Sequence, residues 1–96
     1  MDINKKYKNG QKVAEQTGDE RIIYYENGNI RAKGEFTNDK MQGKWIFHRK
    51  SGALWAEGEL KDDIKDGVWK RWDKEGKLEY HAIFKSGKLT EKILRQ

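Results

Sequence analysis

The chain has 96 residues, enough for one small domain or one short repeat array and too few for two independent domains. Hydrophobic residues make up 34% and charged residues 39%, but the aromatic content of 11%, with four tryptophans, argues against a disordered chain. The net charge of +5 favours a well-solvated, mildly basic surface over a dedicated nucleic-acid or acidic-lipid binding stripe.

The first predicted element is a partial hairpin that caps the rest of the chain. The segment "YKNGQKVAE" (7–15) is similar to "YENGNIRAK" (25–33), which lies 18 residues further on. Terminal units of a repeat array depart from the consensus because they must cover an open sheet edge. We expect residues 7–19 to form this degenerate cap.

Three 24-residue repeats are predicted next, at 20–43, 44–67 and 68–91. Their common frame is visible in the aligned segments "ENGNIRAKGEF", "KSGALWAEGEL" and "KEGKLEYHAIF". Small or apolar residues alternate with charged ones in these segments, as in strands with one buried side. Each repeat therefore predicts two strands around a turn whose glycine needs a positive φ. The turn dipeptides are Asn27-Gly28, Ser51-Gly52 and Glu75-Gly76.

Loops are predicted at "TNDKMQG" and "KDDIKDG", each of which leads into a Gly-x-Trp sequence. The alternation assigns one set of side chains to a shared inner side, which Trp45 and Trp69 cover from the other strand of the repeat. This set comprises Ile30, Leu54, Leu78, Ala32, Ala56, Tyr80, Gly34, Gly58, Ala82, Phe36, Leu60 and Phe84. Gly34 and Gly58 are expected to leave room for an aromatic ring or a neighbouring backbone.

The last predicted element is a closing strand at residues 92–96, where Ile93 takes the repeat position of Trp45 and Trp69. A single hairpin is marginal in water, but hairpins laid side by side can bury a shared side. The predicted fold class is therefore all-β. We expect one meandering antiparallel sheet of successive hairpins, built from about three 24-residue repeats plus capping segments.

The repeat unit resembles a MORN-type repeat, with a turn glycine, Leu or Ile two residues later, and a loop ending in Gly-x-Trp. The stretches that carry the resemblance are "GKWIFHRKSGALWAEGEL", "DGVWKRWDKEGKLEYHAIF" and "IIYYENGNIRAKGEF". The unit is similar to the shorter bacterial variant found in YwqK-family antitoxins. This resemblance implies a sheet without enzymatic activity that binds another protein, such as a toxin encoded nearby, as an antitoxin or immunity protein. For MORN repeats at large it also implies an alternative partner, the anionic phospholipids of a membrane surface.

No catalytic, cofactor or metal motif is recognisable, so we expect neither an enzyme nor a bound cofactor. His48 and His81 lie in different repeats with no motif around them, which favours packing or surface roles over acid–base catalysis. The segment "DDIKDG" (62–67) has the acidic character of a calcium loop, but Ile64 occupies a ligand position. A solvated turn is the favoured interpretation.

A binding surface for a partner protein is the better-supported prediction. It centres on Trp55, which stands at a repeat position that is otherwise charged, and exposed Trp and Arg are enriched among residues that anchor interfaces. Trp55, Arg31 and His81 are expected on the outward side of the sheet, opposite the inner set. The alternative that Trp55 packs on a long side chain or on a capping segment stays open. The predicted partner-binding residues are Trp55, Arg31, Tyr24, Tyr25, His81, Arg71 and Trp72.

Charge and hydropathy set the remaining expectations. Residues 68–96 hold eight basic and four acidic groups, so a membrane surface or acidic ligand is the alternative partner, and no specific nucleic acid is expected. The basic residues concerned are Lys70, Arg71, Lys74, Lys77, Lys85 and Lys88. Residues 1–20 lack a signal segment, and no apolar run reaches the ~18–20 residues of a membrane span. We expect a cytoplasmic protein, with a secreted protein lacking its leader as the alternative.

Overall fold

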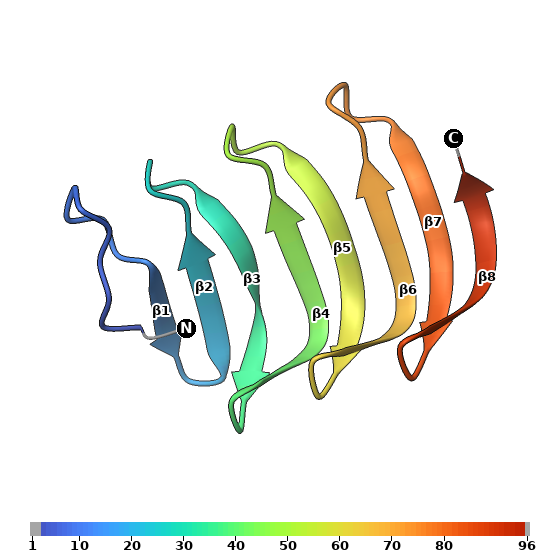
Figure 1. Cartoon of the computed structure of the whole chain (residues 1–96), viewed down its shortest axis with the longest axis horizontal. Helices are drawn as coiled ribbons and strands as arrows, with labels where there is room; N and C mark the ends of the chain where they lie inside the picture. The colour runs from blue at the N-terminus through green and yellow to red at the C-terminus, as the bar shows by residue number, and fades with distance from the viewer. Residues whose placement is uncertain (1–2, 96) are drawn as a thin grey trace.

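The computed structural model describes residues 3–95, which form one antiparallel sheet of eight strands in chain order (Figure 1). The predicted all-β meander is therefore confirmed. The strands are β1 (Ala14–Thr17), β2 (Glu20–Tyr24), β3 (Ile30–Thr37), β4 (Lys40–His48), β5 (Leu54–Lys61), β6 (Ile64–Trp72), β7 (Leu78–Lys85) and β8 (Lys88–Arg95). Residues 1, 2 and 96, which the predicted domain included, lie outside the described residues. Between residues 3 and 95 no helix is long and apolar enough to cross a membrane.

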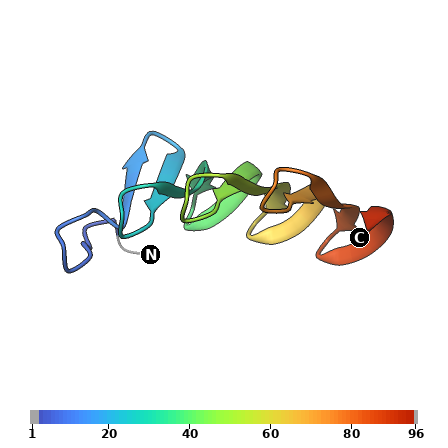
Figure 2. The same ribbon diagram turned by 90° about the horizontal axis from the view of Figure 1, so that it is seen from above.

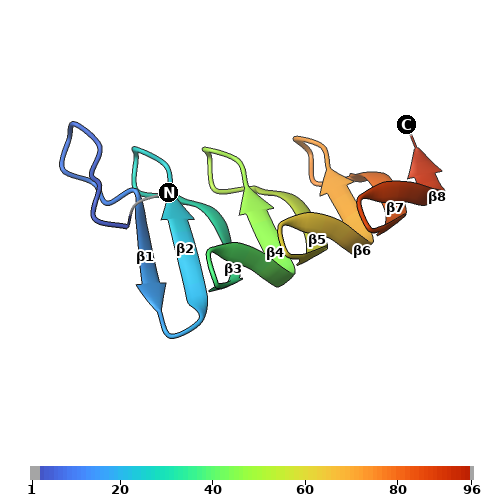
Figure 3. The same ribbon diagram turned by 60° about the horizontal axis from the view of Figure 1, so that its bottom comes forward.

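The sheet is a single twisted layer of bent strands, and no second layer of the described residues covers it (Figures 2 and 3). Its principal extents are 41 × 33 × 17 Å. The hydrophobic core must therefore form between side chains of one face. We call this the core face; it carries Ala32, Trp45, Phe47, Ala56 and Trp69. The opposite side is the reverse face; it carries Lys33, Ile46, Glu57, Lys70 and His81, which pair in one row across the strands.

On the core face, large aromatic side chains lie over glycines of the preceding strand. The Trp45 ring crosses Gly34 and the Trp69 ring crosses Gly58, so closely that a Cβ on either glycine would overlap ring atoms. The indole N–H of each ring donates a hydrogen bond to the carbonyl of the residue after that glycine, at 2.8 and 2.9 Å. The predicted room for an aromatic ring at Gly34 and Gly58 is thus confirmed.

Two-residue turns close the hairpins β3–β4, β5–β6 and β7–β8. Both residues of each turn have positive φ, as in type I′ turns, whose twist matches that of the strands. The turns are Asn38-Asp39, Asp62-Asp63 and Ser86-Gly87. The predicted loops at this end are therefore wrong in extent, because β4 and β6 already begin at Lys40 and Ile64. The expected loop glycines instead lie inside these strands, beside register shifts, with φ of 66° at Gly43 and 127° at Gly67.

Longer loops at the opposite end of the sheet repeat one hydrogen-bond pattern. In the loop that starts at Tyr25, the N–H of Tyr25 donates to the Asn29 carbonyl (2.8 Å) and the N–H of Gly28 donates to the Tyr25 carbonyl (3.0 Å). The loops that start at Tyr7, Arg49 and Asp73 contain the same two hydrogen bonds. The segment before β1 therefore contains the same loop as the later units.

Side chains connect each of these loops to the next one. The side chain of the first residue in one loop donates a hydrogen bond to the backbone carbonyl of the residue just before the next loop. These hydrogen bonds hold successive hairpins side by side. The hydrogen bonds are Tyr7 to Tyr24 (2.8 Å), Tyr25 to His48 (2.7 Å) and Arg49 to Trp72 (3.1 Å). The series ends at Asp73, whose carboxylate accepts hydrogen bonds from the backbone of its own loop.

Candidate binding surface

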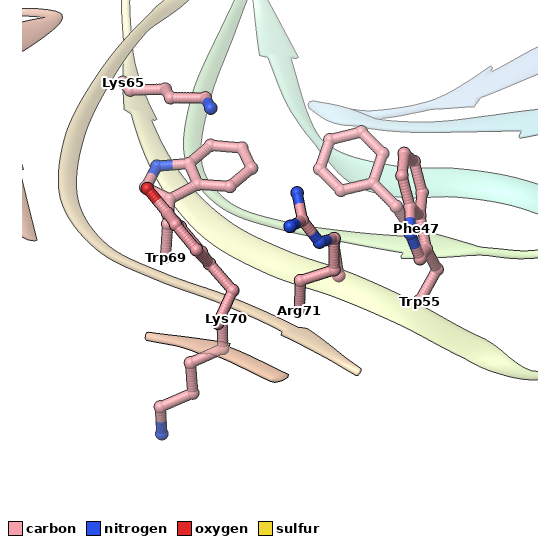
Figure 4. Close-up of a pocket in the computed structure, with 8 residues that line it drawn as sticks. Phe47, Trp55, Lys65, Trp69, Lys70 and Arg71 are labelled. Carbon is pink, nitrogen blue, oxygen red and sulfur yellow. The ribbon is translucent and has the colours of Figure 1, made fainter. Parts of the chain in front are cut away.

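A register shift between β4 and β5 decides where Trp55 lies. His48 pairs with Leu54 and Phe47 pairs with Ala56, so Trp55 is an extra residue in a β-bulge. The bulge places Trp55 on the core face, beside Phe47 (Figure 4). The prediction that Trp55 lies on the outward side, opposite the inner set, is therefore wrong, because a bulge interrupts the period of two.

The same bulge recurs in the other repeats. Arg31 is the extra residue opposite β2, and Glu79 is the extra residue opposite β6. The outward placement of Arg31 is therefore also wrong. The residue before each bulge changes side as well. The alternation predicts Ile30, Leu54 and Leu78 on the inner side, but they lie on the reverse face. Their partners there are Tyr24, His48 and Trp72. Leu54 is accordingly 38% exposed.

Trp55 is the exposed neighbour of a row of stacked rings. The Phe47 ring stacks between Trp45 and Trp69, with centroid distances of 6.3 and 5.9 Å and interplanar angles of 28° and 26°. Trp45 is fully buried, whereas Trp55 is 39% exposed. A large, rigid aromatic side chain that stays exposed beside stacked rings is the kind of residue that anchors interfaces.

A cavity of about 160 Å³ lies between Trp55 and Trp69. Phe47, Ala56 and Tyr80 contribute to its largely apolar lining. Figure 4 shows the Arg71 side chain between Trp69 on one side and Phe47 and Trp55 on the other, with Lys70 pointing away. This cavity combines aromatic walls with a cation.

Two cations border this cavity and rest on aromatic rings. The Arg71 guanidinium lies 5.0 Å from the Tyr80 ring centroid, and its Nε donates to the Glu79 carboxylate at 2.9 Å. The Lys65 ammonium lies 4.7 Å from the ring centroids of Trp69 and Phe84. Cation–π contacts of this kind hold charged groups over an apolar surface while leaving them reachable from solvent.

A second cavity, of about 380 Å³, extends from Trp55 toward β2 and β3. Its lining includes Tyr25, whose hydroxyl is held by the His48 carbonyl, and Arg31, whose guanidinium lies 5.6 Å from the Tyr25 ring centroid. Trp55 lines both cavities. It therefore stands at the centre of a hollowed strip on the core face.

The structure divides the predicted partner-binding residues between the two faces. Those that line the two core-face cavities are Trp55, Arg31, Tyr25 and Arg71. Those on the reverse face are Tyr24, Trp72 and His81, which pair with Ile30, Leu78 and Lys70. The predicted partner-binding set lacks Phe47, Lys65, Trp69 and Tyr80, which the structure brings around Trp55 and Arg71. Phe47 stands at the frame position of Arg71, 24 residues earlier, and this is the signal that could have found it.

On the reverse face, the Tyr24 hydroxyl is held within the sheet. It donates a hydrogen bond to the Glu15 carboxylate, which joins β2 to β1. This hydrogen bond, with smaller effects from burial and from the Glu15 charge, raises the pKa of Tyr24 from 10.0 to about 12. Tyr24 therefore has a clear structural role in the first hairpin.

The acidic segment 62–67 joins neighbouring hairpins. The Asp63 carboxylate accepts from the backbone N–H of Met41 (2.7 Å), and the Asp66 carboxylate accepts from that of Ser86 (3.0 Å). No group of three or more His, Asp or Glu side chains in the described part of the chain could hold a metal ion. These carboxylates thus satisfy backbone donors at the tight-turn end of the sheet.

The family model of the MORN repeat variant matches residues 20–38 and 65–86. Each match runs along one strand, through a long loop and along the next strand, from β2 to β3 and from β6 to β7. The matches support a MORN-type repeat protein, and MORN repeats are generally modules that bind proteins or membranes. No curated protein and no solved structure matches the chain significantly.

Proposed function

We propose that the chain is a non-catalytic module that binds one partner protein across its core face, as an inhibitor of the antitoxin or immunity type. The observation that carries the proposal is the position of Trp55, a 39% exposed tryptophan between two cavities on an otherwise packed aromatic face. Phe47, which lies beside Trp55, is held by stacking between Trp45 and Trp69, so a partner would meet a preorganised surface.

The distribution of basic residues favours a protein over a membrane as the partner. A flat anionic surface needs cations gathered on one side of the molecule. Here Lys70 and Arg71 lie on opposite faces, since Lys70 pairs with Glu57 and Arg71 with Ala56. The others lie at opposite ends of the strands: Lys74 and Lys77 at a long loop, Lys85 and Lys88 at a two-residue turn. The charge excess of the last third is thus dispersed.

Oxidative footprinting of the four tryptophans tests the proposal. The chain is exposed to hydroxyl radicals alone and with the soluble protein fraction of its source cells, and oxidation is quantified by peptide mass spectrometry. We expect partner binding to protect Trp55 more than Trp72, because Trp72 lies on the reverse face and serves as the internal control. Equal oxidation of Trp55 with and without the fraction, or protection of Trp72 alone, would contradict the proposal.

A further inference from the structure

Two cations occupy core-face positions that are apolar one repeat, or 24 residues, earlier. Lys65 occupies the frame position of Met41, and Arg71 occupies that of Phe47. Met41 and Phe47 both pack against the core cluster. Their replacements keep the same side of the sheet, since Lys65 pairs with Leu60 and Arg71 with Ala56.

A charged group on an apolar face costs solvation unless it has partners. Arg71 has one carboxylate partner, Glu79, which accepts from Nε. Within residues 3–95, the Arg71 terminal nitrogens form no hydrogen bond and Lys65 forms no ion pair. The lining of the cavity between Trp55 and Trp69 therefore includes Lys65 and Arg71, and donors of Arg71 are still free. Lys70 is the third cation in the lining, but its side chain points away from the cavity (Figure 4).

An anionic group attached to an apolar one fits this arrangement. The guanidinium can present two parallel N–H groups to a carboxylate, and the Lys65 ammonium can add a second charge contact. The rings of Phe47, Trp55 and Trp69 offer apolar contact to the flanking carbons. A phosphate ion would satisfy the two charges but would leave the aromatic walls without contact. A polypeptide with apolar side chains next to an Asp or Glu would use both.

We infer that this cavity, which we call the acid-binding pocket (Phe47, Trp55, Lys65, Trp69, Arg71 and Tyr80), receives an Asp or Glu side chain flanked by apolar residues on the partner protein. This inference rests on the proposed function and specifies the partner's chemistry. The Glu79 carboxylate occupies one edge of Arg71 and competes with the incoming acid. The pocket therefore predicts that removing the Glu79 charge strengthens binding.

The probe is the capped tripeptide acetyl-Leu-Glu-Leu-amide, compared with acetyl-Leu-Gln-Leu-amide, which has the same shape without the charge. Binding to the full chain is followed by NMR through the indole N–H signals. We expect the acidic peptide to shift the Trp55 and Trp69 signals and to leave Trp72, on the reverse face, unshifted. The amide peptide should bind about five- to tenfold more weakly, as expected for the loss of a charge-assisted hydrogen bond.

The repeat frame supplies matched variants. Lys65→Met and Arg71→Phe install the residues found 24 positions earlier, and each should weaken binding of the acidic peptide about fivefold. Lys70→Met, on the reverse face, should change the affinity less than about twofold. Arg71→Gln replaces Arg71→Phe if the latter fails to fold. Glu79→Gln should strengthen binding about twofold, a gain that mere structural damage does not produce.

Three outcomes would overturn the inference. The two peptides could bind equally, or Lys70→Met could weaken binding as much as Lys65→Met. Alternatively, inorganic phosphate or vesicles of phosphatidylcholine with phosphatidylserine could shift Trp55 and Trp69 while the acidic peptide does not. Each of these leaves the proposed function standing if footprinting still shows protein-dependent protection of Trp55. Conversely, peptide binding without such protection would reject the proposed function alone.

Discussion

Replacement of Gly58 by alanine should destabilise the protein by about 3 kcal/mol, a large part of the total stability expected for a domain of this size. The added Cβ would overlap the ring of Trp69. That ring cannot move aside freely, because it stacks on Phe47 and its N–H is held by the Glu59 carbonyl. Urea unfolding followed by circular dichroism should show a lower midpoint with an unchanged slope.

The chain itself supplies the control for this prediction. At a distance of 24 residues after Gly58 and Trp69, Ala82 stands at the glycine position and Ile93 stands at the tryptophan position. Ala82 pairs with Lys92, and with isoleucine at position 93 no indole ring is present to overlap the Ala82 Cβ. The double variant Gly58→Ala with Trp69→Ile should therefore be less destabilised than the sum of its two single variants. Additive losses would mean that ring overlap is not the cause.

Replacement of Trp45 by alanine should cost about 3–5 kcal/mol, or prevent folding. Trp45 is fully buried and sits in the cluster that includes Ala32 and Leu60. Its removal leaves a cavity and deprives the Glu35 carbonyl of its donor. Chemical denaturation should report the loss.

Trp55→Ala is the matched comparison for Trp45→Ala, because the same side chain is deleted from the same face. It should cost less than about 1.5 kcal/mol, since Trp55 is 39% exposed and donates no hydrogen bond within the described chain. If the two variants lost similar stability, Trp55 would be a core residue and its proposed role in binding would have no structural basis.

The repeat frame was sufficient to predict the sheet and its central packing. A 24-residue spacing placed Trp45 and Trp69 over the inner side and identified Gly34 and Gly58 as the positions that admit a ring. These predictions succeeded because a glycine in a strand and a tryptophan in the next strand are both unusual, and the repeat showed them together. The departure at Ala82 and Ile93 follows the same physical rule.

The side on which Trp55 lies could not be predicted from the alternation of residues. A prediction from alternation assumes that successive side chains switch faces without interruption along a strand. A bulge adds one residue, so the residues before it lie on the face opposite to the predicted one. The bulge is visible only in the pairing of β5 with β4, where Leu54 and Ala56 face adjacent residues. The extent of the tight turns was missed for a related reason, since Asn38-Asp39 and Asp62-Asp63 adopt positive φ without a glycine.

The central claim is that Trp55 anchors a partner protein, and the affinity of that partner for two single variants tests it most directly. Trp55→Ala is compared with Val68→Ala, which removes an equally exposed apolar side chain (39% and 40%) from the reverse face. By isothermal titration with the purified partner, Trp55→Ala should weaken binding at least about 30-fold and Val68→Ala less than about threefold. A Trp55→Ala variant that binds as tightly as the unmodified chain, or a Val68→Ala variant that loses as much affinity, would contradict the claim.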